Sequence, residues 1–427
     1  MVINISDGKT RKGSISEKLY VLGRREKAEG GILNIGRYYA LDKSLGSNVY
    51  VDGAKPHVIL ICGKRGYGKS YTMGTFIEEI SLMDESIRKN IGVVVIDTLG
   101  IYWTSFFENK KQEGALSRWG CSPTGLKIKV LSSPDSVNEY RKKGIDAEKF
   151  SLRTSEITPS QWCQLFGAEL IEPLGVAVAR AINEMDIDYS IDDIIAFIKK
   201  DRRTRDEIKG AGENFFNMAK SWNVFDREGL PLDKIVKNGE IMILDISLFS
   251  EELKIIIVAV LSRKIFERRV RERKKDEERI MEHRNTDETS EKIFPMVCMA
   301  IDEAQVFLPY EKKISKDVLI KQWMRQGRQP GLSLVLATQR PSALDPEVLS
   351  HSDIIICHRL TAQEDIDALN KVRPTYMQGE ISEALKKVGA EKGVALIIDD
   401  TSESVHIIKI RPRLSWHGGE EPSAMVK

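Results

Sequence analysis

The residues best suited to chemistry form the stretch Gly63-Lys-Arg-Gly-Tyr-Gly-Lys-Ser70, which fits the spacing GxxxxGK[ST]. Glycines in such a loop let the backbone wrap around a phosphate and turn its N–H groups inward. The lysine then reaches the β and γ phosphates, and the serine offers its hydroxyl to Mg²⁺. The alternative, a glycine-rich turn with an incidental lysine, is disfavoured by the apolar run before the loop and the helical pattern after it. We expect ATP to contact Gly63, Gly66, Tyr67, Gly68, Lys69, Ser70 and Tyr71.

A pair of adjacent carboxylates, Asp302 and Glu303, follows another apolar run. We expect Asp302 to hold Mg²⁺, directly or through water, and Glu303 to polarise the attacking water as a general base. Two neighbouring carboxylates at a strand end repel each other, and a cation beside them removes that cost. An ordinary acidic corner between a strand and a loop is the alternative interpretation.

Four further side chains beside the apolar run Gly331–Gln339 could complete such a site. Gln339 ends an apolar strand and could sense the γ phosphate or orient the water; a satisfied polar strand end is the alternative. Arg325 and Arg328 precede that strand, and either could reach a neighbouring subunit's nucleotide as an arginine finger. Arg340 is a weaker candidate, and a solvated helix end is the alternative for both earlier arginines.

Near-continuous apolar runs must position these residues. Such runs are typical of strands that are buried on both faces of a parallel sheet. Because helical stretches separate most of them, they predict an α/β core with helices on both faces. The runs are His57–Cys62, Ile91–Asp97, Gly239–Ser247, Phe294–Glu303, Gly331–Gln339, Ser352–Leu360 and Gly393–Asp399.

The remaining segments suggest a division of the chain into domains. Residues 1–56 carry short alternating apolar runs, which predict a small β-rich part similar to a reduced barrel. Residues 57–157 and 238–411 form the two parts of the core, separated by a helical insertion over 158–237. The insertion opens with Thr158 as a helix N-cap and Pro159 at the first helical position. A helix begins at Glu251, and we expect the charged stretch that continues it to end in a solvated loop before Thr289. Residues 412–427 are either a disordered tail or a brace onto a neighbouring subunit.

Composition limits the kinds of partner. The 427 residues include 65 basic and 63 acidic side chains, so no global positive field indicates nucleic acid, and any such site must be a local patch. Three basic stretches are candidates, although a solvated charged face is the other interpretation of each: Arg88–Gly92, Lys110–Gly120 and Lys199–Gly210. The 5 cysteines occur singly, as in a reduced compartment. No signal peptide is visible and no apolar stretch approaches the ~20 residues that a membrane helix needs, so we expect a cytoplasmic protein.

The motifs and their spacing resemble those of the HerA/FtsK class of ring ATPases, and in particular the HerA-like group. The resemblance is carried by GKRGYGKS, AIDEAQVFLP and RQGRQPGLSLVLATQRPS, and it extends over Leu33–Arg411. It implies a RecA-like core that assembles as a hexameric ring around DNA and moves along it with ATP and Mg²⁺. It also implies a partner nuclease or other effector, in DNA repair or antiviral defence.

The family's functional residues map onto motifs already described. Its Walker lysine corresponds to Lys69, its acidic pair to Asp302 and Glu303, its sensor glutamine to Gln339 and its trans-acting arginine to Arg328, with Arg325 as the near alternative. The chain departs from the family in two places. The stretch before the first core strand is too short for the complete β-barrel that usually opens the family. After the second strand, DTLGIYW keeps Asp97 but lacks the family's glutamate, which leaves that position without an assigned role.

Two other functions remain open at this point. One is a nucleotide-gated scaffold ring that recruits an effector, with slow hydrolysis. The other is a conjugation or packaging ATPase that pumps DNA across a boundary, which ranks lower because such relatives commonly carry a membrane anchor.

Overall fold

One large sheet dominates the protein. The structure, a computed structural model, describes residues 20–25, 30–40, 42–186, 188–281, 293–311, 313–371, 381, 383–386, 388–389 and 391–419. Its strands form a 13-stranded sheet of order β1-β3-β2-β15-β14-β13-β4-β12-β11-β5-β10-β6-β7 and a small sheet of β8 and β9. The strands are β1 (Val21–Leu22), β2 (Ile32–Tyr39), β3 (Leu45–Asp52), β4 (Val58–Cys62), β5 (Ile91–Asp97), β6 (Ile128–Ser132), β7 (Asp146–Lys149), β8 (Leu152–Arg153), β9 (Phe225–Asp226), β10 (Ile241–Asp245), β11 (Met296–Ile301), β12 (Leu332–Thr338), β13 (Ile354–Cys357), β14 (Val394–Asp399) and β15 (Ser404–Ile410).

The middle of the sheet is parallel, as the apolar runs predict. All pairings from β13 through β4, β12, β11, β5, β10 and β6 to β7 are parallel, whereas β14, β15 and β2 join antiparallel. All seven predicted strands are present, which confirms the α/β, mostly parallel fold class. The phosphate loop follows β4 and the acidic pair follows β11. In the order β13-β4-β12-β11-β5, only β12 separates these two strands. Because these strands are parallel, their carboxyl ends meet at one edge.

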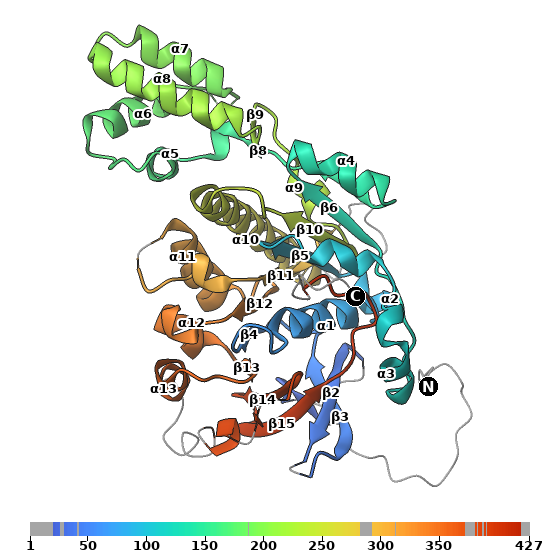
Figure 1. Ribbon diagram of the computed structural model, residues 1–427. Helices are drawn as coiled ribbons and strands as arrows, with labels where there is room; N and C mark the ends of the chain where they lie inside the picture. The colour runs from blue at the N-terminus through green and yellow to red at the C-terminus, as the bar shows by residue number, and fades with distance from the viewer. Residues whose placement is uncertain are drawn as a thin grey trace, which may run out of the picture.

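Helices cover both faces of the sheet (Figure 1). The helices are α1 (Lys69–Ser81), α2 (Glu85–Arg88), α3 (Glu113–Arg118), α4 (Pro134–Lys142), α5 (Pro159–Leu165), α6 (Pro173–Asn183), α7 (Ile191–Lys200), α8 (Asp206–Ser221), α9 (Leu232–Ile235), α10 (Glu251–Met281), α11 (Ile314–Val318), α12 (Pro346–His351) and α13 (Gln363–Lys371). Shorter helical turns are η1 (Tyr102–Phe106), η2 (Lys110–Gln112), η3 (Thr154–Glu156), η5 (Ala304–Val306), η6 (Leu319–Met324) and η7 (Pro341–Ala343).

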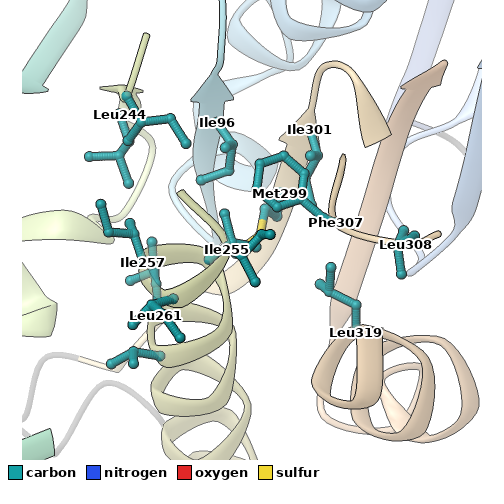
Figure 2. Close-up of a cluster of buried hydrophobic side chains, with 14 of the residues drawn as sticks. Ile96, Leu244, Ile255, Ile257, Leu261, Met299, Ile301, Phe307, Leu308 and Leu319 are labelled. Carbon is teal, nitrogen blue, oxygen red and sulfur yellow. The ribbon is translucent and has the colours of Figure 1, made fainter. Parts of the chain in front are cut away.

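Alternate residues of each central strand point to opposite faces, and both faces are buried. In β4, Ile59 and Ile61 share a core cluster with Phe76 of α1, whereas Leu60 belongs to the cluster on the other face. Figure 2 shows that other cluster, in which Leu244, Ile96 and Ile301 of three neighbouring strands lie against Ile255, Ile257 and Leu261 of α10. Full burial of an isoleucine or leucine stabilises the fold by about 1.5–3 kcal/mol, which explains why these strands are apolar throughout.

The predicted helical insertion is present as α5 to α8, which lie together at one end of the molecule (Figure 1). Thr158 is its N-cap: the hydroxyl accepts a hydrogen bond from the backbone of Gln161, whose side chain bonds back in a capping box, and Pro159 is the first helical residue. The segment also contains the short strand β9, which pairs with β8. The domain bounds themselves remain a prediction.

The N-terminal strands do not form a separate barrel-like part. β2 pairs antiparallel with β15, so β1, β3 and β2 extend the large sheet. At the amino end of β4, the imidazole of His57 lies between two carboxylates, with its Nδ1 2.6 Å from Asp353 and its Nε2 3.5 Å from Asp52. Arg24 donates to the same Asp52. This charge cluster joins the N-terminal strands to the core, which explains why they add to its edge.

Two other expectations concern the charged stretch after Glu251 and the C-terminal segment. The charged stretch after Glu251 continues the helix as far as Met281, as predicted for its start. The solvated loop expected before Thr289 falls within residues 282–292, which lie outside the described part of the chain. The segment 411–419 is ordered and packs along α1 of its own chain, where Arg411 and Arg413 form ion pairs with the buried Glu78. Residues 411–419 are therefore not a free tail, whereas the brace onto a neighbouring subunit stays a prediction, and residues 420–427 lie outside the described part. No helix among the described residues is long and apolar enough to cross a membrane.

Candidate nucleotide-binding site

The phosphate loop connects β4 to α1. Gly63, Gly66 and Gly68 have φ angles of 150°, 80° and 114°, a region that L side chains rarely adopt. Within the described part of the chain, the backbone N–H groups of Gly66, Gly68, Lys69 and Ser70 have no hydrogen-bond acceptor. Unpaired donors at a helix N-terminus are what an anion requires, so the loop fits a phosphate group.

A buried histidine, His358, packs against the phosphate loop at Gly63. A Cβ on Gly63 would lie 2.6 Å from the Cβ of His358, which leaves room only for glycine. The Nδ1 of His358 donates to the carbonyl of Val394 at 3.1 Å, so its Nε2 accepts from the hydroxyl of Thr72 at 2.8 Å. Burial lowers the pKa of His358 to about 4, which keeps the imidazole neutral. Neither motif nor spacing pointed to His358.

Lys69 and Ser70 face the acidic pair. The Nζ of Lys69 is buried, and among the described residues its one hydrogen bond is to the carbonyl of Lys64, at 3.4 Å. Burial lowers the pKa of Lys69, against the opposite pull of Glu303 and Asp302. The hydroxyl of Ser70 donates to Oδ2 of Asp302 at 2.9 Å. The structure thus brings together the ends of two motifs that lie more than two hundred residues apart.

The environment of Asp302 fits a divalent cation. Burial and the neighbouring Glu303 raise the pKa of Asp302, although hydrogen bonds from Ser70, the Glu303 amide and Tyr102 oppose this. A carboxylate and a hydroxyl provide the hard oxygen ligands that Mg²⁺ prefers. A cation here would offset the repulsion between the two carboxylates. Asp302 and Ser70 are therefore suited to hold Mg²⁺.

Glu303 is half-buried beside this pair, and its backbone is left-handed, with φ 50° and ψ 48°. The amide of Gln339 donates to Oε1 of Glu303 at 2.5 Å. The strand end predicted to carry a sensor residue therefore lies next to the predicted base. A pocket lined by Gln339, Arg340, Lys64 and Arg65 opens beside them.

The two candidate arginine fingers differ in their surroundings. Arg325 forms an ion pair with Glu347 through Nε at 3.0 Å and Nη2 at 2.5 Å. Arg328 is exposed and has no ion-pair partner among the residues that the structure describes. Among the described residues no hydrogen bond or ion pair joins either arginine to the phosphate loop, and Arg340 is exposed at the pocket rim.

The two tyrosines of the loop point in different directions. The hydroxyl of Tyr67 accepts from Nη1 of Arg359 at 2.9 Å, and the Arg359 guanidinium lies 5.4 Å from the ring centroid. The hydroxyl of Tyr71 instead donates to Gln112 at 2.6 Å and accepts from the Arg413 amide at 2.6 Å. Because the Tyr71 side chain holds the C-terminal segment, only its backbone remains for the nucleotide.

Asp97, whose role the sequence left open, orders the loop after β5. Its two oxygens accept from the amides of Leu99, Gly100 and Tyr102 at 3.2, 2.8 and 2.8 Å. Burial and the neighbouring Asp245 raise the pKa of Asp97 to about 7. The Tyr102 hydroxyl then donates to Oδ2 of Asp302 at 3.1 Å. Asp97 therefore acts on the site indirectly, by placing Tyr102 against Asp302.

Comparison with known proteins matches a family described as "Helicase HerA, central domain" to residues 33–265. The probable DNA double-strand break repair helicase HerA of Methanocaldococcus jannaschii is 28% identical over 127 residues, which are 29% of this chain and 24% of that protein. The DNA double-strand break repair helicase HerA of Pyrococcus furiosus is 22% identical over 187 residues, 41% of this chain and 33% of that protein. The chain thus matches no more than about a third of the length of these relatives. Among solved structures, VirB4 of Thermoanaerobacter pseudethanolicus has a TM-score of 0.54 at 13% identity, over 90% of this chain and 97% of that chain, and this likeness shows the fold alone.

Proposed function

The chain belongs to the family of the HerA helicase central domain, and on that premise we propose that it is an ATPase that moves DNA as a hexameric ring. The observation that carries the proposal is the hydrogen bond of 2.9 Å between Ser70 and Asp302. It joins a loop of unpaired amides to an acidic pair, and a glutamine from a third strand contacts the second acid. These are the parts that phosphoryl transfer to water needs.

In this proposal, the chain's own groups bind the phosphates and activate water. The amides of Gly66, Gly68, Lys69 and Ser70 and the Nζ of Lys69 bind the β and γ phosphates. Ser70 and Asp302 hold Mg²⁺, which neutralises charge on the phosphate oxygens when bound. Glu303 accepts a proton from the attacking water, and Gln339 orients that water or senses the γ phosphate.

The ring in this proposal is supported by the family resemblance and by one exposed arginine. Arg328 is exposed and without an ion-pair partner among the described residues, so it is free to stabilise the transition state in the next subunit. Hydrolysis at each interface would then couple to movement along DNA. A partner nuclease or other effector belongs to the same proposal, supported only by the family resemblance.

We propose the α7–α8 loop as one DNA contact. Within the basic stretch 199–210, Lys199, Arg203 and Lys209 are engaged in ion pairs. Lys200, Arg202 and Arg205 are exposed and form no ion pair among the described residues. Replacing these three by alanine should weaken DNA binding and reduce its salt dependence by about 0.9 in slope for each lost phosphate contact. An unchanged slope would show that this loop is only a solvated face.

The test of the function is ATP hydrolysis with and without DNA, in the wild type and in Lys69→Ala and Glu303→Gln. We expect DNA to stimulate turnover, Lys69→Ala to abolish it, and Glu303→Gln to bind ATP without hydrolysing it. Native mass measurement should give six subunits in the presence of ATP. Hydrolysis that is indifferent to DNA would favour the nucleotide-gated scaffold, and a fully active monomer would refute the ring.

A further inference from the structure

Gln305 lies between the predicted general base and the neighbouring strand end, and no role has been assigned to it so far. Its Nε2 donates to Oε2 of Glu303 at 2.5 Å. Its Oε1 accepts from the hydroxyl of Thr338, the last residue of β12, at 2.7 Å. The side chain therefore joins Glu303 to the same strand end that carries Gln339.

The carboxylate of Glu303, which can only accept, sets the direction of the hydrogen bonds that link Glu303, Gln305 and Thr338. The amide of Arg340 donates to the hydroxyl oxygen of Thr338 at 3.2 Å, so the Thr338 hydrogen is free to point to Gln305. Because the Glu303 carboxylate needs a donor, the NH₂ group of Gln305 points toward it, and the Gln305 oxygen is left to accept the Thr338 hydrogen. The opposite orientation of the amide would place its oxygen against a carboxylate oxygen. The polarity thus runs in one direction, from Arg340 to Glu303.

Glu303 needs such a tether because its backbone is strained. A non-glycine residue at φ 50° costs free energy and persists only where its surroundings hold it. Two amides hold its carboxylate, Gln339 on Oε1 and Gln305 on Oε2. Each carboxylate oxygen can accept more than one hydrogen bond, so both tethers leave a lone pair for water.

We propose that Gln305 is a positioning residue that orients Glu303 for water activation, and that Thr338 sets the orientation of Gln305. This inference rests on the proposed ATPase activity. It makes the end of β12 act on Glu303 by two routes, one through Gln339 and one through Thr338 and Gln305. A change at that strand end would therefore reach the general base even where Gln339 is unaltered.

The test is the steady-state kinetics of Gln305→Met, Thr338→Val and the double variant. Gln305→Met should lower kcat by about 10- to 100-fold, as expected when a catalytic group loses its orientation. The KM for ATP and the affinity for a non-hydrolysable analogue should stay within about twofold of the wild type, since uniform binding is untouched. Thr338→Val should lower kcat less, and Thr338→Ser, which keeps the hydroxyl, should restore it.

The double variant separates positioning from general damage. Because both residues act through one tether, adding Thr338→Val to Gln305→Met should lower kcat no further. Gln363→Met is the matched control, since its amide also donates to a carboxylate, Asp367, at 2.8 Å on an exposed helix, and it should hydrolyse ATP normally.

Three results would overturn the inference: an unchanged kcat in Gln305→Met, effects of the two changes that multiply, or a loss confined to KM. Should Gln305→Met fail to fold, the comparison of Thr338→Val with Thr338→Ser decides, since equal kcat values would refute the tether. A wild type that binds ATP but never hydrolyses it would instead refute the proposed function, and the two failures are thereby distinguishable.

Discussion

Replacing Glu78 should destabilise the protein more than any other single change of charge on α1. Glu78 is fully buried and accepts from Arg411 at 2.8 Å, from Arg413 at 2.5 Å, and from the amide and hydroxyl of Ser415 at 2.9 and 2.6 Å. Burial alone would raise the pKa of Glu78, but Arg413 and Arg411 outweigh it and lower the pKa, so the group is ionised at neutral pH.

The size of the effect follows from which arginine keeps a partner. In Glu78→Gln, Arg411 still pairs with Glu79 at 2.7 Å. Arg413 retains the Ser415 hydroxyl and no carboxylate among its described contacts. One buried guanidinium is left uncompensated, which costs about 3–5 kcal/mol. In the control Glu79→Gln, both arginines keep Glu78, and the loss should be about 1 kcal/mol.

Urea unfolding at constant protein concentration, followed by far-UV circular dichroism, measures the free energy of unfolding of each variant. Limited proteolysis should also cut segment 411–419 faster in Glu78→Gln than in the control. Adding Arg413→Met to Glu78→Gln should recover part of the loss, because the unpaired charge is removed. The reasoning is wrong if Glu78→Gln is no more costly than Glu79→Gln, or if the double variant is less stable than both singles.

Three further predictions concern other parts of the molecule. Burial lowers the pKa of His57, but hydrogen bonds to its two aspartates outweigh this and raise the pKa from 6.5 to about 9. The cluster should therefore contribute about 3 kcal/mol to the free energy of unfolding below pH 6.5, and this contribution is lost as the pH rises toward 9. In urea unfolding at several pH values, the His57→Asn variant should not show this decrease in stability. Arg328→Ala should abolish ATP turnover, and Arg325→Ala should retain most of it. Mixing the Arg328→Ala and Lys69→Ala variants should restore some activity, at interfaces where an intact Arg328 faces an intact Lys69. No recovery on mixing would exclude action in trans. Tyr102→Phe should raise the Mg²⁺ concentration for half-maximal hydrolysis by about tenfold, because Asp302 loses a hydrogen bond that orients it, and an unchanged Mg²⁺ titration would contradict that role.

The central strands and the two main motifs could be predicted because their signals are local. Burial on both faces demands an unbroken apolar run, as in β5, where all of Ile91–Asp97 is buried. The phosphate loop needs glycines at fixed spacing beside one lysine and one hydroxyl. The strands that were missed carry exposed or half-buried polar residues and lack such a run; they are β6, β7, β8, β9 and β15.

The sequence by itself determined which groups could bind a triphosphate, since Lys69, Ser70, Asp302 and Glu303 are recognisable from their immediate neighbours. Only the tertiary structure decided what holds them in place. The contact of Tyr102 with Asp302 depends on the registration of β5 against β11, and that of Gln305 with Thr338 on the pairing of β11 with β12. The fold-back of segment 411–419 likewise depends on a carboxylate more than three hundred residues earlier. Such partners are distant in the chain and close only after folding, so no local pattern of residue types could have specified them.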